Sequence, residues 1–284
     1  MGTAPAPFLF LRARASPLRA LYIYLRALYI YFNTRAHQSQ RKALDKRPKL
    51  WYTVRDKTRK GRRGMKHYDR VLWDFNGTLL DDLRLCMDSV NLLLERRGLP
   101  LLADEEAYRR VFGFPVQAYY ARLGLPSEGE GYTVAAHEWI AAYRAGEHTA
   151  PLREGSAHLL ERLMAAGVPQ GVLSATESGM LREQVAGLGI GACFDCILGR
   201  EDIYATDKSE IARAFRRAHP VERILMIGDT LHDVDTARAG GFDPVLVEGG
   251  HQDRETLLSA GCPVFPDFGA LSAWLFEEVD GNGV

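Results

Sequence analysis

The chain has 284 residues, of which 46% are hydrophobic and 10% are aromatic. This length and composition provide a hydrophobic core for one large or two small domains, and they exclude a chain that is disordered throughout. The formal net charge of zero conceals two unlike parts. Residues 1–64 hold 16 Lys and Arg against two Asp, whereas the other 220 residues hold 20 basic and 34 acidic side chains.

The basic segment 1–64 contains the heptapeptide Leu-Arg-Ala-Leu-Tyr-Ile-Tyr twice in succession, at 18–24 and 25–31. Two copies are too few for a solenoid, and the stretch is too short and too rich in arginine to span a bilayer. A membrane-surface helix, a targeting presequence and a nucleic-acid-binding arm all fit its scarcity of acidic residues. Because Met65 leads almost directly into the first core strand, we interpret residues 1–64 as a disordered extension or a start-site artefact. We expect no transmembrane segment, and no nucleic-acid partner for the rest of the chain.

Four cysteines are scattered along the chain, at Cys86, Cys193, Cys196 and Cys262. Cys193 and Cys196 have the spacing of a metal-binding or redox pair. No second pair and no clustered histidine accompanies them, so we interpret them as incidental strand residues. With no clear secretory signal in the sequence, the expected location is the reducing cytoplasm.

The first core strand is predicted at Val71–Trp73, an apolar run typical of a strand buried on both faces of a sheet. Asp74 follows this strand directly. A carboxylate at the carboxyl end of a parallel strand lies in the crevice where open α/β sheets bind ligands, which makes Asp74 the first candidate for chemistry. The alternative is an aspartate that caps a turn, because Asn76-Gly77 is a common turn dipeptide.

The pattern over residues 83–150 is helical, with apolar residues at helical spacing and with Gly98-Leu-Pro100 and Gly124-Leu-Pro126 dividing it into short helices. We therefore expect a small all-helical cap domain at 83–150. Within it, the segment Val111–Pro115 separates two helices. It either presents a backbone turn toward a ligand or is a plain interhelical turn.

Beyond Pro151, predicted strands and helices alternate. Repeated β-α units of this length predict an α/β fold, a Rossmann-like parallel sheet with helices on both faces, formed by residues 65–82 and 151–284. The expected strands are 168–173, 194–198, 223–227, 244–247 and 263–265, and the expected helices are 155–166, 178–187, 210–218, a helix that ends at 239, 255–260 and 269–279.

Polar side chains gather at the expected carboxyl ends of these strands. They are Asp74, Ser174, Lys208, Asp229 and Asp233. In a parallel sheet all such ends lie on one edge, so these residues can meet in one crevice. Three crowded carboxylates repel one another unless a hard divalent cation lies among them, and Mg²⁺ accepts one or two carboxylates together with substrate phosphate. The Ser hydroxyl and the Lys ammonium would then hold phosphoryl oxygens, which leaves Asp74 to act as a nucleophile.

In order and context, Asp74–Thr78, Ser174, Lys208 and Gly228–Asp233 resemble the four motifs of the haloacid dehalogenase (HAD) superfamily, from about Lys66 to the C-terminus. The helical insertion with its Gly-Phe-Pro turn is similar to the cap of phosphoglycolate-phosphatase-type members. The resemblance implies a magnesium-dependent phosphohydrolase that acts on a small phosphorylated metabolite through an aspartyl-phosphate intermediate. It assigns catalysis to Asp74, Asn76 and Lys208, substrate binding to Gly77, Thr78, Ser174, Ala175 and Lys208, and the metal to Asp74, the backbone carbonyl of Asn76, Asp229 and Asp233, the last of which supports either the metal or Lys208.

Asn76 departs from the family pattern. Phosphatases of the family carry Asp at this position, where it protonates the leaving oxygen and then activates water, and an amide cannot exchange that proton. General acid-base help is typically worth about 10²–10⁴ in rate. We therefore expect weakened catalysis, with the largest penalty on alkyl phosphates and the smallest on acyl or aryl phosphates.

Asn76 leaves several alternatives open. A working phosphohydrolase could take its acid from His232 or a cap residue, or could act on activated phosphates. The alternative is a catalytically weak or inactive pseudoenzyme that binds phosphate esters. Phosphonate cleavage in the family uses a cap lysine, and no lysine lies between Lys66 and Lys208, which disfavours that reaction. Deamidation of Asn76 before Gly77 would restore the acid.

Five further side chains have two interpretations each. We favour a solvent-facing position for His232 on the first turn of a helix, with the role of acid as the alternative. Four arginines of the helical insertion could grip a substrate carboxylate in a bidentate manner, but surface arginines on helices are the ordinary case. These arginines are Arg109, Arg110, Arg122 and Arg144.

Overall fold

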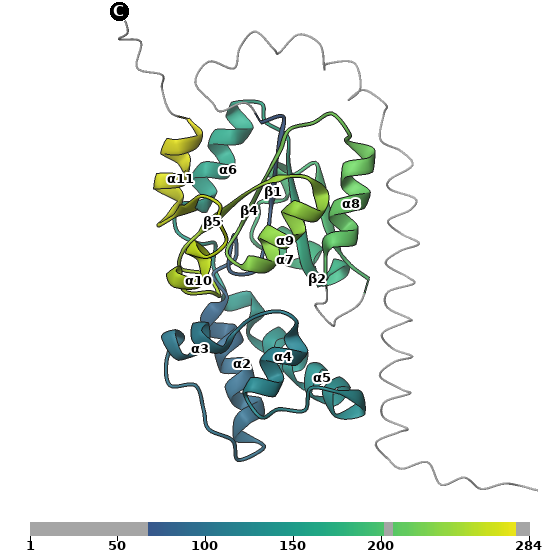
Figure 1. The fold of residues 1–284 in the computed structure, drawn as a ribbon, viewed down its shortest axis with the longest axis vertical. Coiled ribbons are helices and arrows are strands. Elements are labelled where there is room, and N and C mark those ends of the chain that lie inside the picture. The colour runs from purple at the N-terminus through teal and green to yellow at the C-terminus, as the bar shows by residue number, and fades with distance from the viewer. Residues whose placement is uncertain (1–67, 202–206, 277–284) are drawn as a thin grey trace, which may run out of the picture. The chain divides into compact units, whose positions relative to one another are not determined.

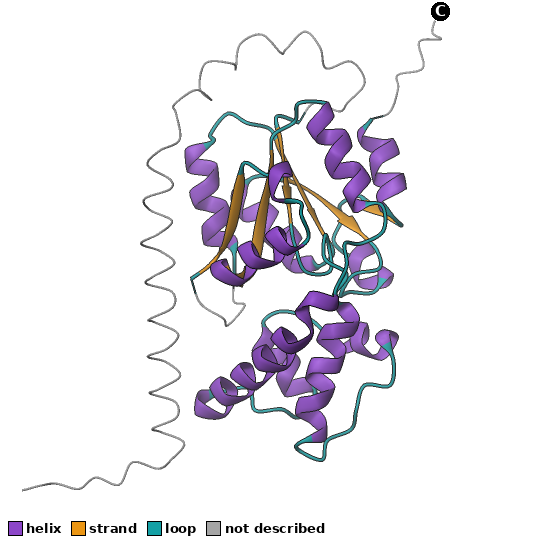
Figure 2. Ribbon diagram, turned by 180° about the vertical axis from the view of Figure 1, so that it is seen from behind, coloured by secondary structure: helices purple, strands orange, loops and turns teal. Residues whose placement is uncertain are grey.

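The computed structural model describes residues 68–201 and 207–276. The interpretation of residues 1–64 lies outside the described residues. Six strands form one parallel sheet in the order β3-β2-β1-β4-β5-β6. Figure 2 shows the sheet as a layer between helices. The predicted α/β fold with a parallel sheet is confirmed.

The elements follow the chain in the expected alternation (Figure 1). The strands are β1 Arg70–Trp73, β2 Gln170–Glu177, β3 Cys196–Arg200, β4 Ile224–Gly228, β5 Asp243–Val247 and β6 Val264–Phe265. The helices of the insertion after β1 are α2 Leu83–Glu95, α3 Glu105–Val111, α4 Val116–Arg122 and α5 Gly129–Gly146, followed by the 3₁₀ turn η1 Glu147–Thr149. The remaining helices are α6 Ser156–Ala165, α7 Ser178–Gly187, the 3₁₀ turn η2 Gly191–Cys193, α8 Ser209–Ala218, α9 Leu231–Gly240, α10 Arg254–Leu258 and α11 Phe268–Leu275.

The central strand β1 is buried on both faces because its side chains alternate between two hydrophobic clusters. Val71 and Trp73 contact the cluster that includes residues of α6 and α11, whereas Leu72 contacts the cluster that includes residues of α8 and α9. All four residues of β1 are buried. This double burial explains the continuous apolar run in the sequence and fixes the strand in the middle of the sheet.

The helices α2, α3, α4 and α5 form a separate hydrophobic cluster, which we call the cap. Its core is rich in tyrosine, with Tyr108, Tyr119, Tyr120, Tyr132 and Tyr143 all buried. The expected breaks are present, because Gly98 follows α2 and Gly124 follows α4, with backbone φ angles of 64° and 74°. Glycine adopts this left-handed conformation without the penalty that a Cβ atom brings.

Most expected boundaries differ from the structure by one or a few residues, and two of these differences are described here. The strand expected at 168–173 is β2, which continues to Glu177, so Ser174 and Ala175 lie within the strand and not after it. An irregular register against β3, between Leu173 and Glu177, accounts for the extension. The last helix begins at Phe268 because the Asp267 side chain accepts a hydrogen bond from the backbone of Ala270.

The cysteines and the membrane prediction can also be compared with the structure. All four cysteines are free, and no group of potential metal ligands among the described residues includes Cys193 or Cys196. Within the described ranges, no helix has the length and apolar character needed to cross a membrane.

Candidate active site

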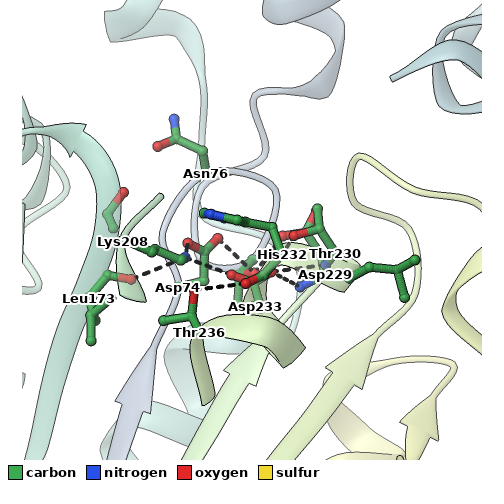
Figure 3. Close-up of polar contacts among 12 residues, drawn as sticks. Asp74, Asn76, Leu173, Lys208, Asp229, Thr230, His232, Asp233 and Thr236 are labelled. Carbon is green, nitrogen blue, oxygen red and sulfur yellow. Dashed lines mark hydrogen bonds and ion pairs between the residues drawn. The ribbon is translucent and has the colours of Figure 1, made fainter. Parts of the chain in front are cut away.

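Three aspartates meet at the carboxyl ends of β1 and β4. One carboxylate oxygen from each of Asp74, Asp229 and Asp233 lies within 4.8 Å of the other two, and all three residues are buried (Figure 3). The pairing of β1 with β4 brings them together, since the backbone N–H of Asp74 donates to the Ile227 carbonyl at 2.8 Å. The structure therefore places the first and last predicted motifs side by side.

Lys208 supplies the positive charge of this cluster. It lies just before α8 and is 1% exposed, and its Nζ donates to Asp74 Oδ1 at 2.5 Å and to Asp233 Oδ1 at 2.6 Å. Burial alone would lower the pKa of Lys208, but Asp233 and Asp74 raise it above the usual range. Lys208 therefore stays protonated between the two carboxylates.

One ammonium does not balance three carboxylates. Burial, together with the charges of Asp233 and Asp229, raises the pKa of Asp74 to about 8, although Lys208 opposes this shift. The pKa of Asp229 is also raised, chiefly by burial. Buried oxygen ligands that repel one another are a donor set suited to a hard divalent cation, so the residues present fit Mg²⁺.

Asp233 differs from the other two carboxylates because both of its oxygens accept several hydrogen bonds from the protein itself. Its Oδ2 accepts from the backbone N–H of Asp229, and from both the backbone N–H and the hydroxyl of Thr230, at 2.7 to 3.1 Å. Its Oδ1 accepts from Lys208. The bond from the Thr230 backbone N–H is one half of the capping box that begins α9. Of the two roles expected for Asp233, the geometry favours support of Lys208.

Gly77 and Thr78, expected to bind substrate, contact the carboxylates. The Thr78 hydroxyl donates to Asp229 Oδ1 at 2.7 Å and lies 3.2 Å from Asp74 Oδ2. Gly77 has a φ of +75°, and a Cβ atom on it would lie 2.4 Å from Asp229 Oδ2 and from His251 Cδ2. Both residues thus fix the position of Asp229 in this structure.

Asn76 is held by three hydrogen bonds outside the carboxylate cluster. Its Nδ2 donates to Asp82 Oδ2 at 2.7 Å and to the Tyr143 hydroxyl at 3.0 Å, and its Oδ1 accepts from the Thr176 hydroxyl at 2.6 Å. In Figure 3 the side chain points away from the aspartates. Because Asp82 accepts a hydrogen bond, this position requires a donor, which an amide always provides and a carboxyl group provides only when it is protonated.

Asp82 and His251 form a buried pair that sequence reasoning did not identify. His251 Nε2 lies 3.3 Å from Asp82 Oδ1, and the His251 backbone N–H donates to Asp229 Oδ2 at 2.7 Å. The Tyr108 hydroxyl of α3 lies 3.1 Å from His251 Nδ1. The pair therefore links the cap to the carboxylate cluster. One signal was present in the sequence: His251 follows Gly249-Gly250 just after β5, at the same edge of the sheet.

The solvent-facing position favoured for His232 is wrong. Its ring stacks on Phe114 with centroids 4.2 Å apart, and its side chain is 11% exposed. Burial and the nearby Lys208 ammonium lower the pKa of His232 to about 4. A histidine that is neutral near pH 7 has no proton to donate as a general acid, so the geometry does not favour that role. Since Phe114 faces this ring, the turn at Val111–Pro115 contacts the site.

The four cap arginines are all engaged elsewhere in this structure. Arg109 donates to the carbonyl of Gly250, and Arg122 donates to the carbonyl of Val111. Arg110 pairs with Glu106 and Arg144 pairs with Glu183. The interpretation of these side chains as ordinary arginines on the surface of helices is therefore favoured over a role in gripping a substrate carboxylate.

A cavity of about 150 Å³ opens above the aspartates. Of the predicted site residues, Asp74, Asn76, Ser174, Ala175, Lys208 and Asp233 line it. Among the described residues, Gly77, Thr78 and Asp229 are not part of its lining. The remaining walls come mainly from the cap.

The chain is similar to proteins of known family. A family model described as haloacid dehalogenase-like hydrolase matches residues 71–247. The phosphoglycolate phosphatase of Rhodospirillum rubrum is 32% identical over 219 residues, which cover 72% of this chain and 90% of that protein. Tyrosine-protein kinase PtkA of Mycobacterium tuberculosis is 33% identical over 193 residues, which cover 64% of this chain and 62% of that protein. A solved haloacid dehalogenase-like hydrolase from Streptococcus pneumoniae has a TM-score of 0.64 at 21% identity, covers 73% of this chain and 98% of its own, and shares the fold.

Replacing Gly77 with alanine tests how closely the backbone of Gly77 approaches Asp229 and His251. The left-handed backbone alone should cost about 1–3 kcal/mol of unfolding free energy, and the clash with Asp229 and His251 should add to this loss. The matched control is Gly187→Ala at the end of α7, where nothing lies within 4 Å of the added carbon. Urea unfolding should show a lower stability for Gly77→Ala only. Equal stability of both variants would contradict the described geometry.

Proposed function

Because the chain belongs to the haloacid dehalogenase-like hydrolase family, we propose that it is a magnesium-dependent phosphohydrolase that acts on a phosphorylated small molecule through an aspartyl-phosphate on Asp74. The observation that carries this proposal is the convergence of Asp74, Asp229 and Lys208 from separate segments onto one buried point below a cavity. The relatives named as phosphatases support the same kind of enzyme.

Asp74 is the group placed to attack phosphorus. It lines the cavity, and its Oδ1 contacts the Lys208 ammonium. Attack by this oxygen breaks the bond between phosphorus and the leaving group, and water then cleaves the aspartyl-phosphate to release phosphate. Lys208, the Ser174 hydroxyl and the Ala175 backbone N–H are the donors available to the phosphoryl oxygens. All three residues line the cavity.

Asp74, Asp229 and the backbone carbonyl of Asn76 are the residues that would hold Mg²⁺. The ion, when bound, would offset the negative charge of the carboxylates and of the phosphoryl oxygens. Lys208 and the hydroxyl of Thr78 contact the carboxylates and keep them in place. The chain itself therefore supplies the orientation of the nucleophile.

Neither Asn76 nor His232 is an evident replacement for the missing acid. Asn76 is committed to three hydrogen bonds, and His232 is neutral. Deamidation of Asn76 requires attack by the Gly77 nitrogen, whose N–H instead donates to Asp82 Oδ1 and to the Leu80 carbonyl, both at 2.9 Å. We therefore infer weak catalysis on esters with poor leaving groups. An inactive phosphate-ester-binding protein is the second candidate, favoured by this same network.

Removal of the nucleophile or of the metal should abolish turnover. We expect Asp74→Asn, or wild type in excess EDTA, to hydrolyse no acetyl phosphate, and we expect Mg²⁺ to restore the EDTA-treated wild type only. Release of inorganic phosphate is the measurement. Acid-quench trapping of ³²P on the wild-type protein, absent from Asp74→Asn, would identify the intermediate. Undiminished turnover by Asp74→Asn would refute the assigned nucleophile.

Asn76→Asp should create the acid that the wild type lacks. The new carboxyl group would face Asp82, and two adjacent carboxyl groups share a proton, which keeps one of them protonated near neutral pH. On an alkyl phosphate such as glycerol phosphate we expect kcat to rise by about 10²–10⁴. On acetyl phosphate the gain should be much smaller, because its leaving group needs no proton. Wild type and variant with equal kcat on the alkyl phosphate would show that the acid comes from another group.

A further inference from the structure

The cavity above Asp74 is walled by aromatic side chains of the cap. Its volume of about 150 Å³ equals that of a dry apolar cavity able to hold one benzene ring. Every helix of the cap contributes at least one apolar or aromatic side chain to the wall. These residues include Cys86 of α2, Tyr108 of α3, Tyr119 and Tyr120 of α4, and Ala136, Trp139, Ile140 and Tyr143 of α5.

The cationic groups that line the cavity already have partners, and Nε2 of His251 lies 3.3 Å from Asp82 Oδ1. Among the described residues that line it, Lys208 is the only lysine or arginine, and its ammonium is held by Asp74 and Asp233. The cap arginines donate to carbonyls or pair with glutamates, as described above. A second carboxylate on a substrate would therefore enter an aromatic wall without a free cation, and desolvation of an unpaired charge is costly.

Two polar atoms of the wall lack a hydrogen-bond partner among the described residues, the hydroxyl of Tyr119 and the Nε2 atom of His232. The hydroxyl of Tyr119 is buried and makes no hydrogen bond to any described residue, and Tyr119 is 3% exposed. Buried hydroxyls are nearly always hydrogen-bonded in proteins, so an unpartnered one in the wall of a cavity indicates a ligand that completes it. Besides its ring faces, the wall thus offers one hydroxyl and one imidazole nitrogen without partners, which suits a neutral aromatic group better than an ion.

The chemistry of Asn76 points in the same direction. A phenol has a pKa of about 10, whereas water, a guide to simple alcohols, has a pKa of about 15.7. A phenolate therefore leaves phosphorus with much less help from a general acid. The missing acid and the aromatic wall are separate features of the core and of the cap, and both favour the same leaving group.

We propose that this cavity selects phosphate esters of a single aromatic ring, aryl phosphates, over small carboxylate-bearing phosphates such as phosphoglycolate. This selection deepens the proposed function and rests on it for turnover, but not for binding. In the reaction, Asp74 forms a bond to phosphorus, and the aryl oxygen leaves with the electron pair and takes a proton from solvent. Water then attacks phosphorus, so that one water is consumed, one phenol and one inorganic phosphate are released, and Asp74 is regenerated.

Binding of non-hydrolysable phosphonates tests the selection without turnover. With Mg²⁺ present, isothermal titration calorimetry should show that benzylphosphonate binds the wild-type chain at least about tenfold more tightly than phosphonoacetate, the factor expected from burial of one phenyl ring. Equal binding of the two probes, or tighter binding of phosphonoacetate, would overturn the proposal. Both probes carry the same phosphonate, so the difference reports the cavity wall alone.

Two variants locate the selection in the cap. Ala136→Leu adds three carbons to the wall and should remove the preference for benzylphosphonate while binding of inorganic phosphate persists. The matched control, Ala141→Leu, changes an exposed residue of the same helix and should keep the preference. Ile140→Ala enlarges the cavity and should strengthen binding of 1-naphthylmethylphosphonate relative to the wild type. If Ala136→Leu does not fold, Ile140→Ala still decides the question, since an unchanged affinity for the larger probe contradicts the assignment.

Turnover separates failure of the selection from failure of the proposed function. We expect phenyl phosphate to be hydrolysed with a higher kcat/KM than phosphoglycolate. If phosphoglycolate is hydrolysed faster, the proposed phosphohydrolase activity is supported and the proposed preference for aryl phosphates is wrong. If benzylphosphonate binds preferentially but neither acetyl phosphate nor any phosphate ester is hydrolysed, the proposed preference is supported and the proposed catalysis is wrong.

Discussion

The ammonium of Lys208, buried between Asp74 and Asp233, is the interaction on which the site depends. Removal of one member of a buried ion pair leaves an uncompensated charge, at a cost of about 3–5 kcal/mol. The three residues also come from the start of α8, the end of β1 and the start of α9, so the contact fixes three separate elements relative to the sheet. The capping box of Thr230 and Asp233 holds the third element, which makes the geometry of Lys208 a consequence of helix capping as well as of charge.

Much of this site could be predicted because its residues occupy recognisable positions in the local sequence pattern. Asp74 and Asp229 each follow an apolar strand, and parallel pairing places such residues on one edge. The pair of Asp82 and His251 could not be predicted in the same way, because it depends on how the cap helices meet the loop after β5. The length of β2 was also missed, since the irregular pairing of Ser174 to Glu177 with β3 leaves no mark in the local pattern. The direction of His232 depends on its contact with Phe114, a residue far away in the sequence.

Asn76 stands where the resemblance predicts an acidic Asp, and its surroundings show that the amide has a structural role as well. Asp82 is fully buried, and it accepts hydrogen bonds from Asn76, from Tyr143 and from the backbone of Gly77. Burial alone would raise the pKa of Asp82, but the His251 ring and these donors lower it below its usual range. The amide thus stabilises a charged carboxylate at the junction of the cap and the sheet. In this chain the residue at position 76 is therefore part of a structural network.

The sheet and the cap differ in the part of a substrate that each would recognise, and this difference follows from their chemistry. Under the proposed function, the charges at the sheet edge recognise a phosphoryl group, which all phosphate esters share and which therefore does not distinguish one ester from another. The cap faces this edge with aromatic carbon, and apolar contact area distinguishes one leaving group from another. A catalytic acid would make the rate insensitive to the basicity of the leaving group. Under the proposed function no such acid acts, and the leaving group then contributes both its fit to the cap and its own stability as an anion, so that both parts of the molecule would favour an aryl leaving group.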